Sequence, residues 1–351
     1  MQTSFNYKFK ACRASAEIRQ HFSMVMEPEA GIGPATYALR VRCSTTELPG
    51  RELINYRYIA GILDWYHFDM PKSEPASRQN IAAEVLDFYE SLPFNMRDSV
   101  AEAVKRLKNH DPVDSYPPLK GILKRKSVLE VGCGVGWFSN GLAYHHKTQV
   151  QGIDFNPVAV TRSSDVAKAV GLSSQFEVAD VFEYLPSERV DVVVSLGVLH
   201  HTGDCHGAIR RICQKFLKPE GYFLLGLYHT YGRHPFLAHF ESMKNSGASE
   251  DELYDEFKRI RGGNSDETHL RSWFRDQVIH PHETQHSFEE IATLLEECEM
   301  KIISTSINKY EKIQSMSAIV VEEKKYREIS IEQLNRGIYF PGFFTVLAQH
   351  K

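Results

Sequence analysis

A glycine turn between an apolar run and a helical pattern is the feature that most constrains this chain. Residues 127–136 read Ser-Val-Leu-Glu-Val-Gly-Cys-Gly-Val-Gly, and apolar residues at helical spacing begin at Trp137. A strand, a glycine turn and a helix start are typical of a nucleotide-cofactor loop, because glycine lets the backbone approach a ligand without a Cβ in the way. A dinucleotide fingerprint would place its third glycine at position 137, whereas the glycines here are Gly132, Gly134 and Gly136. The spacing therefore disfavours a dinucleotide cofactor.

From residue 127 onward, expected strands and helices alternate along the chain. This alternation predicts an α/β fold: a doubly wound, Rossmann-like sheet of seven mostly parallel strands with helices on both faces. The expected strands are 127–131, 149–153, 175–179, 190–196, 222–227, 301–307 and 342–348. Helices are expected near 137–145, 157–170 and 205–217.

The chain is predicted to have two parts. Residues 1–120 contain apolar residues at helical spacing, interrupted by prolines, which predicts a mostly helical N-terminal lid or accessory segment. Residues 121–351 make the α/β domain, with insertions at 228–286, after the fifth strand, and at 308–340. Insertions of this size exceed ordinary loops, so we expect them to recognise substrate.

Charge and composition restrict the partners. With a net charge of −4 and a pI near 6.5, the chain has no field to steer a polyanion, so no nucleic-acid partner is expected. No apolar run is long enough to cross a bilayer, so no membrane partner is expected either. The six cysteines are scattered without C-x-x-C spacing, which fits reduced thiols in a cytoplasmic protein.

The glycine turn becomes more specific with the acidic residue that precedes it. Glu130 and the three glycines give E-x-G-x-G-x-G, which resembles motif I of the class I S-adenosylmethionine-dependent methyltransferases. Asp154 and Asp180 end the second and third expected strands, in the order that this resemblance requires. An acid at the first of these ends can accept hydrogen bonds from ribose hydroxyls, and the resemblance implies that the second receives the adenine amino group.

The resemblance covers about residues 120–350 and implies S-adenosylmethionine as the cofactor. The implied cofactor-binding residues are Glu130, Gly132, Cys133, Gly134, Gly136, Asp154, Phe155, Asp180, Val181 and Leu196.

The end of the fourth strand indicates the kind of acceptor. Leu199-His200-His201 and the loop after the fifth strand look most like the branch of the family that methylates small molecules, such as quinone precursors and secondary metabolites. The resemblance therefore implies methyl transfer to an O, N or C centre of a small-molecule acceptor in secondary metabolism. Two alternatives stay open: methylation of tRNA or rRNA, and a non-catalytic partner subunit that binds the cofactor. The oligomeric state is also open, with a homodimer as one candidate.

Polar side chains concentrate in the segments expected to frame the acceptor. A neutral histidine suits proton removal near neutral pH, and ligands of open α/β sheets bind at the carboxyl ends of the strands. The candidate catalytic residues are His200, His201, Asp276 and His282, and the candidate substrate-binding residues are Tyr228, His229, Gln277, His280 and Glu283. The alternative for the His-His pair is that it caps a turn or orders a loop.

No metal is expected. His282 and His286 are four residues apart, with His280 close by, but Pro281 interrupts any helix and the segment is not H-E-x-x-H. Zinc or another divalent ion that positions hydroxyl groups is the alternative interpretation.

Overall fold

A computed structural model describes residues 22–28, 37–43, 78–262 and 266–351, which belong to two units, residues 1–72 and 73–351. In the first unit, β1 (Phe22–Pro28) and β2 (Tyr37–Cys43) pair as an antiparallel two-stranded sheet. These strands differ from the mostly helical segment that we expected. The sequence does carry a signal for β2, because apolar residues and arginines alternate over residues 39–43 with the period of a strand.

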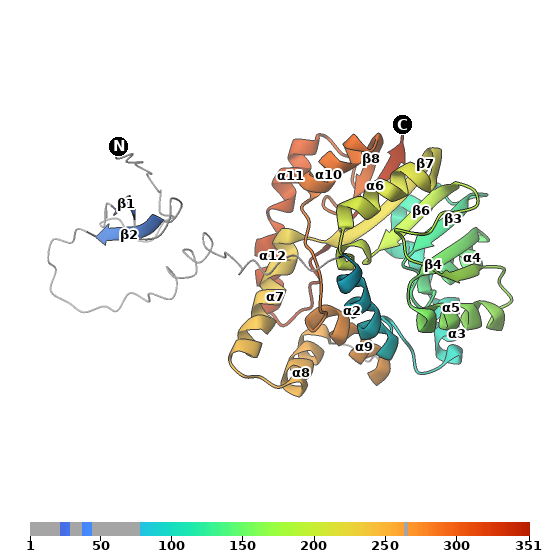
Figure 1. The fold of residues 1–351 in the computed structure, drawn as a ribbon, viewed down its shortest axis with the longest axis horizontal. Coiled ribbons are helices and arrows are strands. Elements are labelled where there is room, and N and C mark those ends of the chain that lie inside the picture. Colours follow the sequence, from blue (N-terminus) through green and yellow to red (C-terminus); the bar gives the residue numbers. More distant parts are fainter. Residues whose placement is uncertain (1–21, 29–36, 44–77, 263–265) are drawn as a thin grey trace. The chain divides into compact units, whose positions relative to one another are not determined.

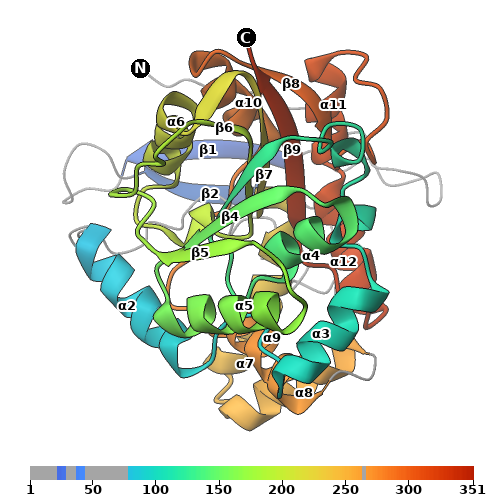
Figure 2. The same ribbon diagram turned by 90° about the vertical axis from the view of Figure 1, so that its right-hand side faces the viewer.

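The second unit is built on a seven-stranded sheet in the order β5-β4-β3-β6-β7-β9-β8 (Figures 1 and 2). Strands β3 to β7 pair in parallel, whereas β9 runs antiparallel to β7 and β8. The strands are β3 (Ser127–Val131), β4 (Gln149–Asp154), β5 (Gln175–Val178), β6 (Val190–Leu196), β7 (Leu217–Tyr228), β8 (Met300–Thr305) and β9 (Phe343–His350). The predicted fold class is confirmed, although β7 begins at Leu217 and not at residue 222.

Both faces of the sheet are buried, as is usual for parallel strands. On β6, the consecutive residues Val192, Val193 and Val194 have no exposed surface. Val193 belongs to a core shared with α6 and α10, whereas its two neighbours belong to a second core with Phe138 and Leu142 of α4. The helices around the sheet are α4 (Trp137–His146), α5 (Pro157–Ala169), α6 (Cys205–Lys215) and α10 (Phe288–Glu297).

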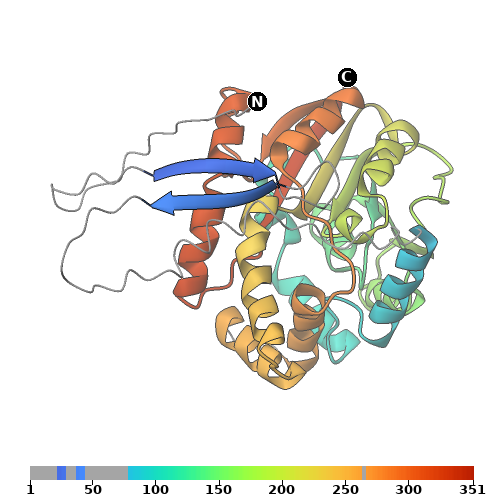
Figure 3. The ribbon, with the colours of Figure 1, turned by 60° about the vertical axis from the view of Figure 1, so that its left-hand side comes forward.

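Both insertions fold into helices: those of the first lie largely beyond one end of the sheet, and those of the second run alongside it on the β8 side (Figures 1 and 3). The first contains α7 (Thr230–Asn245), α8 (Glu250–Arg261) and α9 (Glu267–Val278), and the second contains α11 (Met316–Glu323) and α12 (Tyr326–Asn335). Helices α7, α8 and α9 share a core that includes Phe236, Phe257 and Phe274, against which Leu334 of α12 packs. The two insertions are therefore joined by an apolar core.

Two helices precede the sheet in this unit, α2 (Arg78–Ser91) and α3 (Val100–Asn109), in the region where helical spacing predicted them. Two 3₁₀ turns, Pro112–Ser115 and Pro117–Leu119, lead from α3 to β3. Among the described residues, no helix has the length and apolarity that crossing a membrane requires.

Candidate functional site

A cavity lies at the carboxyl ends of the central parallel strands, where the glycine turn leaves β3. Gly132 and Gly134 line it and have φ angles of 74° and 50°, a region that L side chains rarely adopt. A Cβ on Gly132 would collide with Val198, so this glycine is needed for packing. A Cβ on Gly134 would meet nothing within 4 Å, so the backbone there is open to a ligand. Gly136 has a φ of 76°, but it does not line the cavity.

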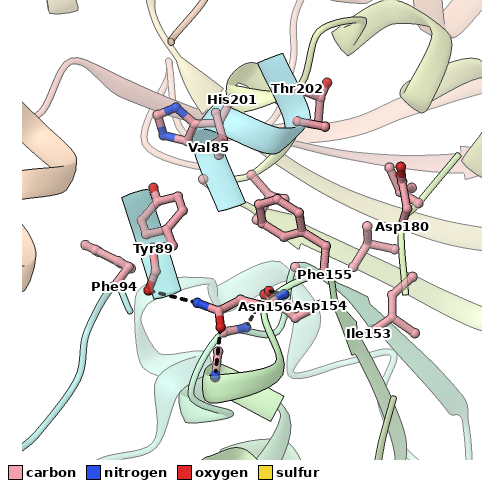
Figure 4. Close-up of a pocket in the computed structure, with 18 of the residues that line it drawn as sticks. Val85, Tyr89, Phe94, Ile153, Asp154, Phe155, Asn156, Asp180, His201 and Thr202 are labelled. Carbon is pink, nitrogen blue, oxygen red and sulfur yellow. Dashed lines mark hydrogen bonds between the residues drawn. The ribbon is translucent and has the colours of Figure 1, made fainter. Parts of the chain in front are cut away.

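The two predicted strand-end aspartates both line this cavity (Figure 4). The Oδ2 atom of Asp154 accepts a hydrogen bond from the Gly134 amide at 2.8 Å, and Oδ1 accepts one from the Asn156 amide at 2.9 Å. Burial raises the pKa of Asp154, opposed by these two hydrogen bonds. Asp180 accepts from the Phe182 amide at 2.9 Å. Of the other predicted cofactor residues, the cavity is also lined by Phe155, Val181 and Leu196.

Glu130, Cys133 and Gly136 are not among the residues that line the cavity. The Glu130 carboxylate accepts hydrogen bonds from the backbone amide (2.9 Å) and the hydroxyl of Ser139, in the first turn of α4. Burial raises the pKa of Glu130 to about 8. These residues shape the turn, and their direct contact with a cofactor stays a prediction.

Helix α2 forms one wall of the cavity through Arg78, Ala82, Val85 and Tyr89. Figure 4 shows α2 with Val85 and Tyr89 on the side of Asp154 and His201. The Tyr89 carbonyl accepts a hydrogen bond from the Asn156 side chain at 2.9 Å, which ties α2 to the turn after β4. The sequence predicted a helical lid in this part of the chain but not which residues of α2 line the cavity, although the spacing of Val85 and Tyr89 places both on one helix face.

Asp276 of α9 lies at the edge of the cavity and collects three hydrogen bonds. Its Oδ1 atom accepts from the Tyr89 hydroxyl at 2.5 Å. Its Oδ2 atom accepts from the Tyr228 hydroxyl at 3.0 Å and from the side-chain amide of Gln277 at 2.5 Å. Burial, reinforced by Asp276, raises the pKa of both tyrosines, so they stay protonated donors. The predicted residues Asp276, Gln277 and Tyr228 are thus brought together.

His201 lines the same cavity, in the turn Leu199–His201 after β6. Its Nδ1 atom is 2.8 Å from the His282 carbonyl, which can only accept, so Nδ1 carries the proton. The Nε2 atom is buried without a hydrogen-bond partner in the described part of the chain, and it lies 3.9 Å from Asp276 Oδ1. Burial lowers the pKa of His201, with Asp276 opposing. The side chain is therefore neutral at physiological pH, with a free lone pair on Nε2.

The other two histidines of the predicted catalytic set, His200 and His282, lie against His201 or its turn, as does His280 of the predicted substrate-binding set. The Nδ1 atom of His200 accepts from the Tyr228 backbone amide at 3.2 Å, and its ring does not line the cavity. His282 donates from Nε2 to the Thr202 carbonyl at 3.2 Å. The His280 ring stacks on His201 with ring centroids 3.8 Å apart. These three residues are placed to hold His201 and its turn.

None of the five predicted substrate-binding residues, Tyr228, His229, Gln277, His280 and Glu283, is among those that line the cavity, and three of them bond to buried side chains. His229 lies 3.0 Å from Glu323, and both are buried. Arg233, whose side chain is fully buried, pairs with Glu283 at 2.7 Å and donates to the Gln277 side chain at 2.9 Å. We did not single out Arg233, although it stands in the same polar run as His229.

The comparison with protein families agrees with this geometry. The methyltransferase domain family matches residues 122–336, so the chain belongs to that family. The predicted class I S-adenosylmethionine-dependent methyltransferase family, and with it the cofactor, is confirmed.

Two curated relatives and one solved structure give the degree of similarity. The ubiquinone biosynthesis O-methyltransferase of Pseudomonas syringae pv. tomato is 35% identical over 116 residues, which cover 32% of this chain and 47% of that protein. A probable chloroplastic tocopherol O-methyltransferase of Oryza sativa subsp. japonica is 38% identical over 84 residues, 23% of each chain. The structure of PKMT2 from Rickettsia typhi in complex with AdoHcy matches with a TM-score of 0.50 at 16% identity, over 70% of this chain and 54% of that one. The chain thus spans about half the length of the ubiquinone relative, 47%.

Proposed function

We propose that this chain transfers a methyl group from S-adenosylmethionine to an O, N or C centre of a small-molecule acceptor. The observation that carries the proposal is one cavity that joins the glycine turn and Asp154 to His201 and Asp276. The open backbone at Gly134 and the carboxylates at two strand ends fit a nucleoside with an amino-acid tail. When bound, the cofactor supplies a methyl group made electrophilic by its sulfonium.

His201 is the residue that we assign as general base. An acceptor O–H or N–H that enters beside it would donate its proton to the Nε2 lone pair as the new bond to carbon forms. The imidazolium so produced lies 3.9 Å from the Asp276 carboxylate, which stabilises its charge. The bond from Nδ1 to the His282 carbonyl holds the ring in the required tautomer.

Helix α2 excludes water from this reaction. Its Tyr89 side chain joins the cofactor end of the cavity to Asp276 at the acceptor end. A site closed to water keeps the electrophile from hydrolysis and strengthens the interaction between His201 and Asp276.

The acceptor itself is proposed from the relatives. Ubiquinone and tocopherol enzymes are both named O-methyltransferases, so a hydroxyl acceptor is the first to test. We also propose a cytoplasmic location, supported by the free thiols of Cys133, Cys205, Cys213 and Cys298, and a role in secondary metabolism.

Methyl incorporation tests the proposal. The full chain is incubated with cofactor labelled in the methyl group and, separately, with fractionated metabolites and with total RNA. We expect label in a metabolite fraction and none in RNA, and we expect Asp154→Ala to lose cofactor binding in calorimetry. Label in RNA alone would favour the tRNA or rRNA alternative, and binding without any transfer would favour the partner subunit.

A further inference from the structure

Two histidines and a glutamate that are not among the residues lining the cavity meet between the starts of α6 and α10. His206 is the second residue of α6, His286 precedes α10, and Glu290 lies in the first turn of α10. One ligand atom from each lies within 4.8 Å of the other two. Glu290 Oε1 is 2.6 Å from His206 Nε2 and 3.1 Å from His286 Nδ1. Two segments distant in sequence, at residue 206 and at residues 286–290, thus meet, and both histidines approach the same carboxylate oxygen.

The hydrogen bonds behind His286 determine which of its nitrogens carries a proton. The Thr284 hydroxyl donates to the His200 carbonyl at 3.1 Å, so its oxygen accepts from His286 Nε2 at 2.9 Å. In the neutral ring, the lone pair of Nδ1 then faces the Glu290 carboxylate. A nitrogen lone pair and a carboxylate oxygen repel each other at 3.1 Å, and either a proton on Nδ1 or a metal ion bound by both atoms removes that repulsion.

The donor set fits a specific class of cation. Two imidazole nitrogens and one carboxylate oxygen are ligands of zinc and its neighbours in the first transition row, whereas magnesium and calcium prefer oxygen alone. His286 is 7% exposed, but His206 and Glu290 are 37% and 38% exposed, so water can complete a tetrahedral shell. The bond from His286 Nε2 to Thr284 is the kind of second contact that orients a metal-binding histidine.

We propose that His206, His286 and Glu290 bind a divalent transition-metal ion, zinc by their donor chemistry. The ion would bridge α6 and α10 and fix the segment that leads back to the site. That segment is already tied to the catalytic turn, because the Thr284 amide donates to the His200 carbonyl at 2.8 Å. The expectation of no metal rested on the spacing of His280, His282 and His286, which does not reveal His206 or Glu290.

Metal binding to the full chain, stripped with a chelator and then dialysed, tests the proposal. Zn²⁺ is titrated in competition with a chromophoric chelator, and Co²⁺ is titrated by visible absorption, which reports tetrahedral coordination. We expect one tight equivalent in the wild type. We expect His206→Ala and Glu290→Gln to raise its dissociation constant by at least about tenfold.

The matched control is His239→Ala. His239 forms a comparable pair with Glu256, 2.8 Å apart, but no third ligand from the described residues joins it. This variant should bind metal as the wild type does, and circular dichroism should show that all three variants are folded. Equal metal affinity in the wild type and His206→Ala would overturn the proposal. So would a wild type that binds no metal and in which NMR shows His286 to be protonated beside Glu290. Neither readout depends on methyl transfer, so the proposal can fail or hold independently of the proposed function.

Discussion

At the scale of single residues, the adjacent histidines His200 and His201 have different hydrogen bonds and different positions relative to the cavity. Both histidines of the Leu-His-His motif were candidate catalytic residues, and nothing in the sequence was a reason to prefer one of them. The structure does so by hydrogen bonding and by position. Nδ1 of His200 accepts from a backbone amide, so its Nε2 carries the proton, whereas Nδ1 of His201 donates and leaves a lone pair on Nε2. Of the two, His201 lines the cavity. Sequence spacing could place both at a strand end, but their orientation depends on Tyr228 and His282, which lie far along the chain.

Replacing His201 by alanine should remove the base and leave the cofactor site intact. We expect kcat to fall by about 100-fold or more for an O–H or N–H acceptor, while the cofactor dissociation constant stays unchanged. Single-turnover assays and calorimetry measure the two quantities. The exposed residue His234 provides the control, since His234→Ala should behave as the wild type. Full activity in His201→Ala would contradict the assignment.

The pH profile of the wild type should carry the same signature. Because burial lowers the pKa of His201, the base stays neutral until the pH falls below the ordinary histidine value of about 6.5. We therefore expect protonation of His201 to lower kcat/KM only at pH values below about 6.5. An acid limb centred above pH 7 would show that another group controls the rate.

Glu130 gives a prediction about stability. Its folded pKa of about 8 lies above the unfolded value, so its stabilising contribution is full below about pH 4.5 and is lost as the pH rises through 8. The free energy of unfolding of the wild type should therefore fall relative to that of Glu130→Gln, which is always neutral, as the pH rises from 5 to about 8. Urea unfolding at several pH values measures this difference. A constant difference between the two proteins would refute the raised pKa.

At the scale of elements, periodicity predicted which segments form strands and helices, and topology predicted where the strand ends meet. Asp154 and Asp180 could be placed in the cofactor cavity from the sequence for this reason. A helical lid could be predicted in the region of α2, but the residues that face the cavity could not, because the spacing of Val85 and Tyr89 shows a shared face but not what that face covers. The partners of Tyr89 come from the turn after β4 and from α9, and no local pattern connects these segments.

Tyr89→Phe tests the role of this wall. The variant keeps the ring and removes the hydroxyl that joins α2 to Asp276, which retains its two other donors. Losing a hydrogen bond to a charged group costs roughly 1.5–3 kcal/mol, so we expect the cofactor to dissociate at least about tenfold faster. Stopped-flow displacement measures the rate, with Tyr144→Phe on α4 as the control. An unchanged dissociation rate would show that α2 does not retain the cofactor.

At the scale of the whole α/β unit, Arg233 joins the helical insertion to the sheet. Its guanidinium lies 4.0 Å from the centre of the Tyr228 ring and binds Gln277 and Glu283. One fully buried charge on α7 therefore contacts β7, α9 and the loop after α9. The polar segments could be recognised in the sequence, but the pairing of Arg233 with Glu283 could not, because these residues are fifty positions apart.

Arg233→Met should destabilise the fold strongly. It leaves the Glu283 carboxylate, which is only 11% exposed, without its partner, and breaking buried pairs in this way costs about 3–5 kcal/mol. The double variant Arg233→Met with Glu283→Gln should recover part of this loss, since the orphaned charge is gone. Chemical denaturation of the three proteins measures the effect, and additive losses in the double variant would contradict the coupling.

The position of α2 also has a thermodynamic consequence for turnover. The same helix lines the cavity next to Asp180 and Phe182 and contacts Asp276 at the opposite end. Two ligands that share one wall cannot bind independently if either shifts it, and linkage then requires the effect to be reciprocal. We expect the acceptor to tighten the cofactor by the same factor by which the cofactor tightens the acceptor.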